Sequence, residues 1–174
     1  TRLLDVGGGS GAFSIAFAER APDLRAVVLD LPEVVEVARG YRDAAGLAER
    51  IALLAADAVR DPWPPDQDIV LLSYLLSAVA DAEIGVLLDK ARDSLRPGGL
   101  LVVHDFMLDD PPGPGPAAAA LWFLQYVAYH PDTVSFSRGE LADRLRRHGF
   151  VPDPAEVLIP GITSVVRARI GSAS

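Results

Sequence analysis

The sequence Leu3-Leu4-Asp5-Val6-Gly7-Gly8-Gly9-Ser10-Gly11 joins an apolar run to a cluster of glycines. The apolar run predicts a buried strand. Glycine lacks a Cβ, so the turn that follows can adopt positive φ and bring its backbone into contact with a ligand. Residues 12–18 favour a helix, for which Ser10 is a candidate N-cap. A strand, a glycine-rich turn and a helix in this order are typical of a nucleotide-binding βαβ unit.

Two classes of ligand fit such a turn. Gly7, Gly9 and Ala12 match the dinucleotide pattern G-x-G-x-x-G/A, with Asp30 about 20 residues further on to bind a ribose hydroxyl. Asp5 favours a cationic ligand instead, because a fixed carboxylate beside the glycines would repel a diphosphate. S-adenosylmethionine (SAM) carries an ammonium and a sulfonium and no phosphate. A turn whose glycines serve only tight packing is the structural alternative.

Composition limits the class of protein. The 174 residues suffice for one domain, and half of them are hydrophobic. A formal net charge of −8 argues against a nucleic-acid partner, which would require a basic surface. The chain has no cysteine, which excludes disulfides and thiolate metal sites, and Lys90 is its only lysine. No run approaches the roughly 20 apolar residues of a membrane span and no signal peptide opens the chain, so we expect a cytoplasmic protein without a membrane partner.

Carboxylates mark the ends of three predicted strands. Asp5 closes the first, and Asp30 and Asp57 close apolar runs over residues 25–30 and 51–57. In an open parallel sheet, ligands bind outside the carboxyl ends of the strands, so the three acids should lie on one rim. A single aspartate at a strand end is usually a helix cap or turn residue. Three of them beside a glycine turn favour a binding site.

The remaining chain continues the alternation of strands and helices. A helix over residues 81–96 should stop at Pro97-Gly98-Gly99, before a buried strand over residues 100–103. Ser137 is a candidate N-cap for a later helix. The other predicted elements are a strand over residues 68–73, helices over residues 117–129 and 138–148, and strands over residues 155–159 and 163–170, the last of which should be antiparallel.

These features resemble the C-terminal catalytic domain of the SAM-dependent O-methyltransferases of the plant caffeate and microbial polyketide type. Asp-Leu-Pro at residues 30–32 is the most specific match. The resemblance implies an α/β, Rossmann-like class I methyltransferase fold: a seven-stranded, mostly parallel sheet with one antiparallel strand and helices on both faces. Residues 1–174 then form the SAM-binding catalytic domain, and the family's N-terminal dimerisation domain is absent from this chain. The segments that carry the resemblance are residues 4–11, 29–32, 56–58, 95–99 and 149–150.

Carried over by position, the resemblance implies a SAM site at the strand ends. Gly7 and Gly9 approach the methionine portion, Asp30 binds the ribose hydroxyls, and Asp57 lies beside the adenine amino group. The other expected cofactor-binding residues are Asp5, whose carboxylate suits a cation, Leu31, which packs on adenine, Ala58, which also flanks the adenine amino group, and Ser73, where plant members have a lysine.

The expected catalytic residues depart from the family pattern. Family members have a His-Asp-Trp after the fourth strand, whose histidine is the general base, whereas this chain has Ser77-Ala78-Val79. A neutral serine cannot act as that base without an activating partner. Asp105 corresponds to the family's glutamate that orients the histidine. His104 is a further catalytic candidate, or simply a hydrogen-bonded rim histidine, and it should point away from Asp105 because neighbours on a strand face opposite sides.

The expected acceptor site is aromatic. Its residues are Phe106, Trp122, Tyr126 and His130, and such apolar walls suit a flat aromatic or polyketide-like small molecule. A metal site of His104, Asp105 and His130 lacks a recognisable spacing, and we expect no metal.

The resemblance implies methyl transfer to a hydroxyl, achieved mainly by positioning, with SAM as cofactor and a homodimer in the full-length protein. Two alternatives remain open. One is an NAD-dependent oxidoreductase, which the aspartates and Asp-Leu-Pro disfavour. The other is a non-catalytic SAM-binding module, which Ser77 keeps open.

Overall fold

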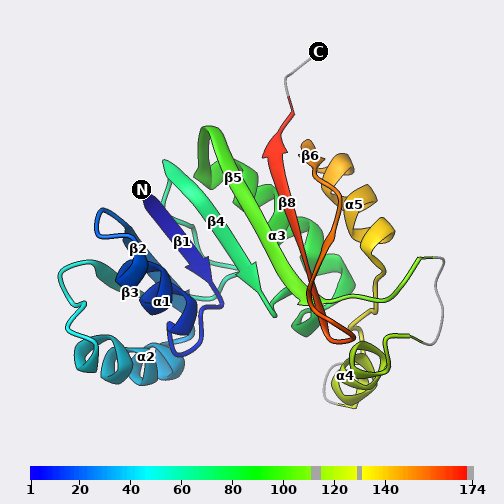
Figure 1. Cartoon of the computed structure of the whole chain (residues 1–174), viewed down its shortest axis with the longest axis horizontal. Coiled ribbons are helices and arrows are strands. Elements are labelled where there is room, and N and C mark those ends of the chain that lie inside the picture. Colours follow the sequence, from blue (N-terminus) through cyan, green and yellow to red (C-terminus); the bar gives the residue numbers. More distant parts are fainter. Residues whose placement is uncertain (111–114, 129–130, 172–174) are drawn as a thin grey trace.

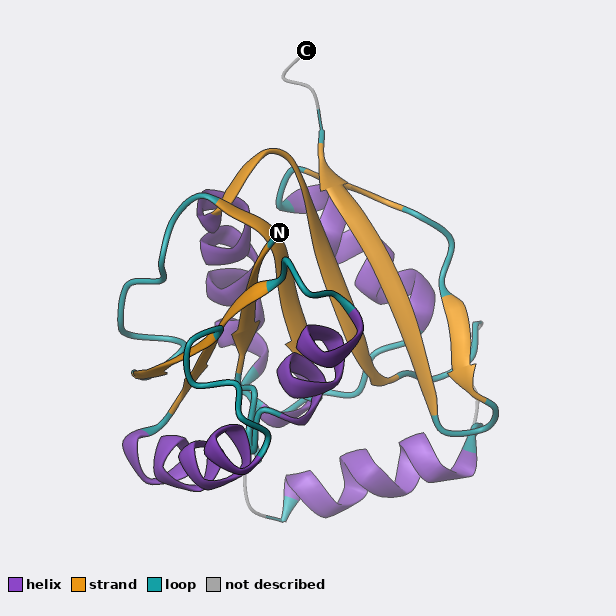
Figure 2. Cartoon of the chain, turned by 60° about the vertical axis from the view of Figure 1, so that its left-hand side comes forward, coloured by secondary structure: helices purple, strands orange, loops and turns teal. Residues whose placement is uncertain are grey.

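A computed structural model of the chain describes residues 1–110, 115–128 and 131–171. They form a mixed sheet with helices on both faces (Figure 1, Figure 2). In chain order, the elements are β1 (Arg2–Val6), α1 (Ala12–Arg20), β2 (Arg25–Asp30), α2 (Pro32–Ala44), β3 (Ile51–Ala55), β4 (Gln67–Ser73), the short 3-10 helix η1 (Leu76–Ala78), α3 (Asp81–Ser94), β5 (Leu95–Phe106), α4 (Ala117–Val127), α5 (Arg138–Arg147), β6 (Phe150–Pro152), β7 (Glu156–Ile159) and β8 (Thr163–Ile170).

The strand order is β3-β2-β1-β4-β5-β8-β6. The first five of these strands are mutually parallel, whereas β8 runs antiparallel to both β5 and β6 (Figure 1). This path of seven strands with one reversed strand confirms the predicted sheet. A further strand, β7, pairs with the first part of β8, and β6 pairs with its last part, so the two short strands together complete one outer edge.

Alternation along the strands divides the apolar side chains between two cores. Leu4 and Val6 of β1 belong to a large cluster that also contains buried residues of α3 and α5. Leu3 of the same strand belongs to a smaller cluster on the α1 face, together with Val28 and Leu71. Because successive strand residues face opposite sides, this division follows directly from the sequence. The sheet is therefore apolar on both faces near its centre.

Several element boundaries differ from the predicted ones. Helix α3 ends at Ser94, and β5 begins at Leu95, so Pro97-Gly98-Gly99 lies inside the strand and does not stop the helix. The N-cap of α1 is Gly11, in the left-handed conformation with φ 76°, and Ser10 does not cap it. The predicted cap Ser137 is confirmed, since its hydroxyl accepts a hydrogen bond from the Glu140 amide.

The C-terminal part contains one unpredicted strand. The three-residue β6 was missed because it is short and includes a proline. The antiparallel strand over residues 163–170 is confirmed as β8. Among the described helices, none combines the length and the hydrophobicity required to cross a membrane.

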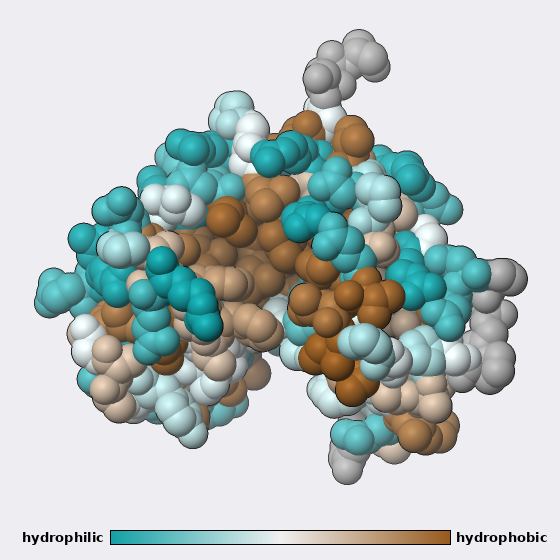
Figure 3. All heavy atoms as spheres, viewed as in Figure 1, coloured by the Kyte–Doolittle hydropathy of each residue, from teal (hydrophilic) through white to brown (hydrophobic). Residues whose placement is uncertain are grey.

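An apolar groove lies on the α1 face of the sheet. Figure 3 shows apolar residues gathered in a hollow on this side of the molecule. The groove has a volume of about 250 Å³ and is lined mainly by Leu3, Phe17, Ile69, Leu71 and Val102. None of these residues lies at the glycine turn, so the groove is separate from the strand ends where the predicted site residues gather.

Candidate cofactor and acceptor site

Two cavities meet at Gly7, at the carboxyl ends of the parallel strands. We call them the Asp30 cavity, of about 340 Å³, and the glycine-turn cavity, of about 240 Å³. The structure brings all eight residues of the predicted cofactor site to these cavities. The Asp30 cavity is lined by Gly7, Asp30, Leu31, Asp57 and Ala58, and the glycine-turn cavity by Asp5, Gly7, Gly9 and Ser73.

The glycine turn is fastened to the end of β2. The Gly9 amide donates a hydrogen bond to Asp30 Oδ2 at 2.8 Å, and the Leu31 amide donates to the other carboxylate oxygen. Gly9 has φ 58°, which favours glycine. At Gly8 a Cβ would lie 2.9 Å from both the Asp5 carboxyl carbon and a Val28 methyl group. Gly8 therefore has no room for a side chain, and the backbone of the turn forms the wall of the glycine-turn cavity.

Asp5 is a buried carboxyl beneath this turn. Its Oδ2 accepts a hydrogen bond from Ser14 Oγ at 2.7 Å, and its Oδ1 has no partner among the described residues. Burial raises the pKa of Asp5 to about 6, with the nearby Asp30 charge acting in the same direction. A carboxyl with an unsatisfied oxygen, held at a ligand-sized cavity, is typical of a functional group rather than of a stabilising one.

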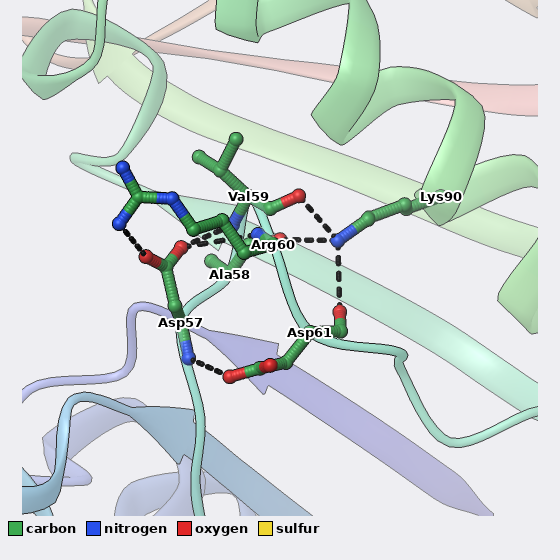
Figure 4. Close-up of polar contacts among 6 residues, drawn as sticks. All are labelled: Asp57, Ala58, Val59, Arg60, Asp61 and Lys90. Carbon is green, nitrogen blue, oxygen red and sulfur yellow. Dashed lines mark hydrogen bonds and ion pairs between the residues drawn. The ribbon is translucent and has the colours of Figure 1, made fainter.

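Asp57 lies two residues beyond β3, in a loop, and not at the strand end itself. Its Oδ1 accepts hydrogen bonds from the amides of Val59 and Arg60, and its Oδ2 pairs with the Arg60 guanidinium (Figure 4). Burial acts to raise the pKa of Asp57, but these donors and the charges of Arg60 and Lys90 together lower it. The carboxylate thus shapes its own loop, and the cavity wall here is formed by the loop as a whole.

His104 and Asp105 point to opposite sides of β5, as predicted. His104 Nδ1 lies 2.9 Å from Ser73 Oγ, and the buried ring packs edge-on against Tyr74 and close to Phe13. Its Nε2 has no partner among the described residues. Burial lowers the pKa of His104, so the imidazole is neutral near pH 7. The two residues do not form a dyad.

Asp105 is connected to helix α4 through Ser77. The fully buried Asp105 carboxylate accepts the Ser77 amide at 3.0 Å, and Ser77 Oγ accepts a hydrogen bond from Trp122 Nε1 at 3.0 Å. Burial raises the pKa of Asp105 to about 6, and hydrogen bonds from Ser77 oppose this rise. The predicted catalytic residues Ser77 and Asp105 are therefore brought together, whereas His104 lies apart from them.

An aromatic cluster adjoins the glycine-turn cavity. Phe106 and Trp122 are stacked, with ring centroids 4.3 Å apart, and Tyr126 lies 5.1 Å from Trp122. The predicted acceptor residue His130 lies outside the described residues. Sequence reasoning missed Tyr74, which lines the cavity and packs 5.2 Å from Phe106. Its position directly after β4 was the available signal, because it places the side chain on the rim.

Metal binding has no support in the described part of the chain, where no three histidine or acidic residues are grouped to hold an ion. The interpretation of His104, Asp105 and His130 as ligands also fails on orientation for its first two members, which face opposite sides of the strand.

Comparison with known proteins identifies the family. A family model described as the O-methyltransferase domain matches residues 1–150. The chain belongs to this O-methyltransferase family. Its resemblance to the catalytic domain of such enzymes is thereby confirmed.

Individual relatives of this O-methyltransferase domain act on different atoms. The 3-hydroxy-5-methyl-1-naphthoate 3-O-methyltransferase of Streptomyces sahachiroi is 38% identical over 126 residues, which cover 72% of this chain and 36% of that protein. The L-tyrosine C(3)-methyltransferase of Streptomyces lavendulae is 30% identical over 165 residues, covering 94% of this chain and 45% of that protein.

A solved structure agrees with the fold. The apo crystal structure of the S-adenosylmethionine-dependent methyltransferase SibL superposes with a TM-score of 0.80 and is 32% identical, covering 98% of this chain and 50% of that one. The chain thus spans half or less of the length of these relatives.

The buried Asp5 gives the domain a specific pH dependence. Its pKa in the folded state, about 6, exceeds the ordinary 3.8, so the folded protein binds this proton more tightly than the unfolded one. The stability linked to the proton is present below pH 3.8 and is lost as the pH rises through 6. The Asp5→Asn side chain is neutral at every pH, so the variant does not lose this stability. Between pH 5 and pH 7 its free energy of unfolding should therefore rise by about 1 kcal/mol relative to that of the wild type.

Denaturant titrations at the two pH values measure this difference. Asp105 contributes the same trend to both proteins, so the comparison isolates Asp5. Parallel pH profiles of the variant and the wild type would contradict the burial of an ionisable group at this position.

Proposed function

We propose that this domain binds SAM in the two cavities and transfers its methyl group to a hydroxyl of a small aromatic acceptor. The observation that carries the proposal is the position of Tyr74. This residue lines the glycine-turn cavity and also packs against Phe106 of the aromatic cluster. Because transfer requires the two reactants in contact, a cofactor cavity that adjoins an aromatic wall is the arrangement that the reaction needs.

The charges at the cavities fit SAM better than a dinucleotide. Among the described residues that line the glycine-turn cavity, Asp5 alone is charged, and it is acidic. This environment suits the ammonium and sulfonium of SAM and would repel a diphosphate. The methionine portion is therefore assigned to this cavity, and the ribose and adenine to the Asp30 cavity, with Gly7 lying under both.

Asp30 and Leu31 are the assigned contacts of the nucleoside. The Asp30 carboxylate already accepts two amide hydrogen bonds, and a carboxylate has about four acceptor positions, so two remain for ribose hydroxyls. Leu31 is 44% exposed and offers apolar surface beside the cavity for the adenine ring. Ala58 lines the same cavity from the opposite loop.

The chain's own part in catalysis is orientation. Bound SAM supplies an electrophilic methyl group. Ser77 is fully buried and its Oγ accepts the Trp122 hydrogen bond, so it holds the aromatic wall and does not remove a proton. Asp105 holds Ser77 in turn. Orientation alone supplies about 7 to 11 kcal/mol of a barrier, and solvent suffices to deprotonate an acidic phenol.

A second candidate function is a SAM-binding module without catalysis. The observation that favours it is Ser77, which stands where the family usually has its general base. Incubation of the chain with SAM and a hydroxynaphthoate, followed by mass spectrometry, separates the two functions, because the module would bind the cofactor and yield no methylated product. NMR of the product would distinguish O-methylation from C-methylation.

Asp30→Ala should weaken SAM binding by about 1 to 3 kcal/mol, because it removes charge-assisted hydrogen bonds to the ribose and loosens the glycine turn. Isothermal titration calorimetry measures the change. Glu36→Ala is the matched control, since this exposed carboxylate on α2 only pairs with Arg39. Equal affinity in all three proteins, or tighter binding of NAD than of SAM, would refute the cofactor assignment.

Ser77→Ala and Trp122→Phe should each lower kcat/KM less than about tenfold, well short of the 10²–10⁴ typical of a lost general base. Both changes remove the same hydrogen bond, so the double variant should lose no more than either single one. Trp122→Ala should cost more, because it deletes the stacked ring itself. A thousandfold loss for Ser77→Ala in steady-state kinetics would show that the serine belongs to a dedicated base.

We further propose that α4 contributes to a homodimer contact in the whole protein. Its outer side chains Leu121 and Leu124 are 65% and 68% exposed, whereas Trp122 faces the aromatic cluster. Replacing both leucines by serine should reduce self-association of the chain in static light scattering, because it removes the apolar surface. Val151→Ser, at another exposed apolar position, is the control. Identical scattering by the wild type and the double variant would contradict this contact.

A further inference from the structure

The only lysine of the chain lies behind the Asp30 cavity. Lys90, on α3, donates hydrogen bonds to the carbonyl oxygens of Ala58, Val59 and Asp61, at 3.0, 2.6 and 2.8 Å (Figure 4). An ammonium group has three N–H donors, and here each one has a backbone acceptor. Lys90 itself does not line the cavity. All three of these hydrogen bonds go to the loop that does.

The rest of this loop is held by its own carboxylates. The Asp57 side chain accepts the amides of Val59 and Arg60, and the Asp61 side chain accepts the Asp57 amide at 2.8 Å. Three amides of the loop therefore donate to its own carboxylates, and three of its carbonyl oxygens accept from Lys90 (Figure 4). Within the described part of the chain, residues 57–61 belong to no strand or helix, so these contacts hold the loop in place of regular secondary structure.

A hydrogen bond from Trp63 also fixes the Ala58 carbonyl to the core. Trp63 Nε1 donates to the Ala58 carbonyl at 2.9 Å, and Lys90 Nζ lies 5.9 Å from the centroid of the Trp63 ring. Trp63 belongs to the large hydrophobic cluster. The Ala58 carbonyl thus accepts two hydrogen bonds, from Trp63 and Lys90, while Ala58 also lines the Asp30 cavity.

We propose that Lys90 is a positioning residue for the cofactor: its ammonium pre-forms the loop at residues 57–61, so that the adenine half of the Asp30 cavity exists before the ligand arrives. The inference rests on the proposed assignment of the adenine to this cavity. A loop that is already ordered has less conformational entropy to lose on binding, so Lys90 contributes to SAM affinity. Among the described residues, Lys90 belongs neither to the aromatic cluster nor to the lining of the glycine-turn cavity, so it should not affect the transfer step.

Substitution separates this role from a general effect on stability. Lys90→Met keeps the length of the side chain and removes all three donors, and it should raise the Kd and the KM for SAM roughly ten- to a hundredfold with kcat nearly unchanged. Lys90→Arg retains a charge and several donors, and it should recover most of the affinity. Arg92→Met is the matched control on the same helix, because Arg92 bonds the His148 carbonyl and does not contact the loop.

Two readouts distinguish the possible failures. Hydrogen exchange of the amides at residues 57–61 should accelerate in Lys90→Met without any cofactor, and calorimetry should show the loss of SAM affinity. Unchanged exchange in Lys90→Met would overturn the positioning role. Faster exchange with unchanged SAM affinity would also overturn it.

If the wild type itself binds no SAM, the proposed function fails, and the inference fails with it even if the exchange result holds. An equal loss of SAM affinity in Arg92→Met would show that the effect of Lys90→Met is a general loss of stability, and would also overturn the inference.

Discussion

The attachment of the glycine turn to the end of β2 determines the geometry of the rim. The turn leaves β1 with no space for a side chain at Gly8, which lies against Asp5 and Val28. Its amide at Gly9 is then bonded by Asp30 of the neighbouring strand. This pair of constraints draws the first two strand ends together around a half-buried strip of backbone. Both cavities are lined by this strip, so their shape depends on glycines, which have no side chain.

Two buried carboxyls act against the stability of the fold. Asp5 on the α1 face and Asp105 beneath η1 both have a pKa raised by burial, and each carries a cost that an apolar residue would avoid. Their partners differ in kind. Asp5 keeps one oxygen without a partner among the described residues, whereas Asp105 is bonded to the Ser77 and Phe106 amides. The first arrangement is suited to interaction with a ligand, and the second to fixing a neighbouring segment. Similar burial therefore goes with two different hydrogen-bonding arrangements on the two sides of the sheet.

The sequence predicted what depends on local pattern and left out what depends on contacts between distant segments. The ends of β2 and β4, the cap at Ser137 and the reversed β8 follow from periodicity and turn chemistry, and they were predicted correctly. The end of β3 was not, because this strand stops at Ala55 and not at Asp57. The site residues at strand ends could be grouped because parallel strands share a rim. Pro97-Gly98-Gly99 was misassigned because its helix-stopping composition was considered without the pairing of β4 with Leu95 and Leu100, on either side of it. Lys90 was missed as a site residue because its partners Ala58, Val59 and Asp61 lie far from it in the sequence. Tyr74 was missed although its position directly after β4 placed it on the rim, and its positive φ of 56° could not be foreseen from the sequence.

The two halves of the candidate site are supported from different directions. The loop beside the Asp30 cavity is held by Lys90 of α3, and the aromatic wall is held through Ser77, which links Trp122 of α4 to Asp105 of β5. The two sets of contacts share no residue. Contacts that share no residue contribute almost independently, so a change at Lys90 should leave the hydrogen bond between Ser77 and Trp122 largely intact, and a change at Ser77 should leave the bonds of Lys90 largely intact. Under the proposed assignment, this separation would let the wall, which carries the departure from the family pattern at Ser77, adapt to another acceptor while the cofactor half stays the same.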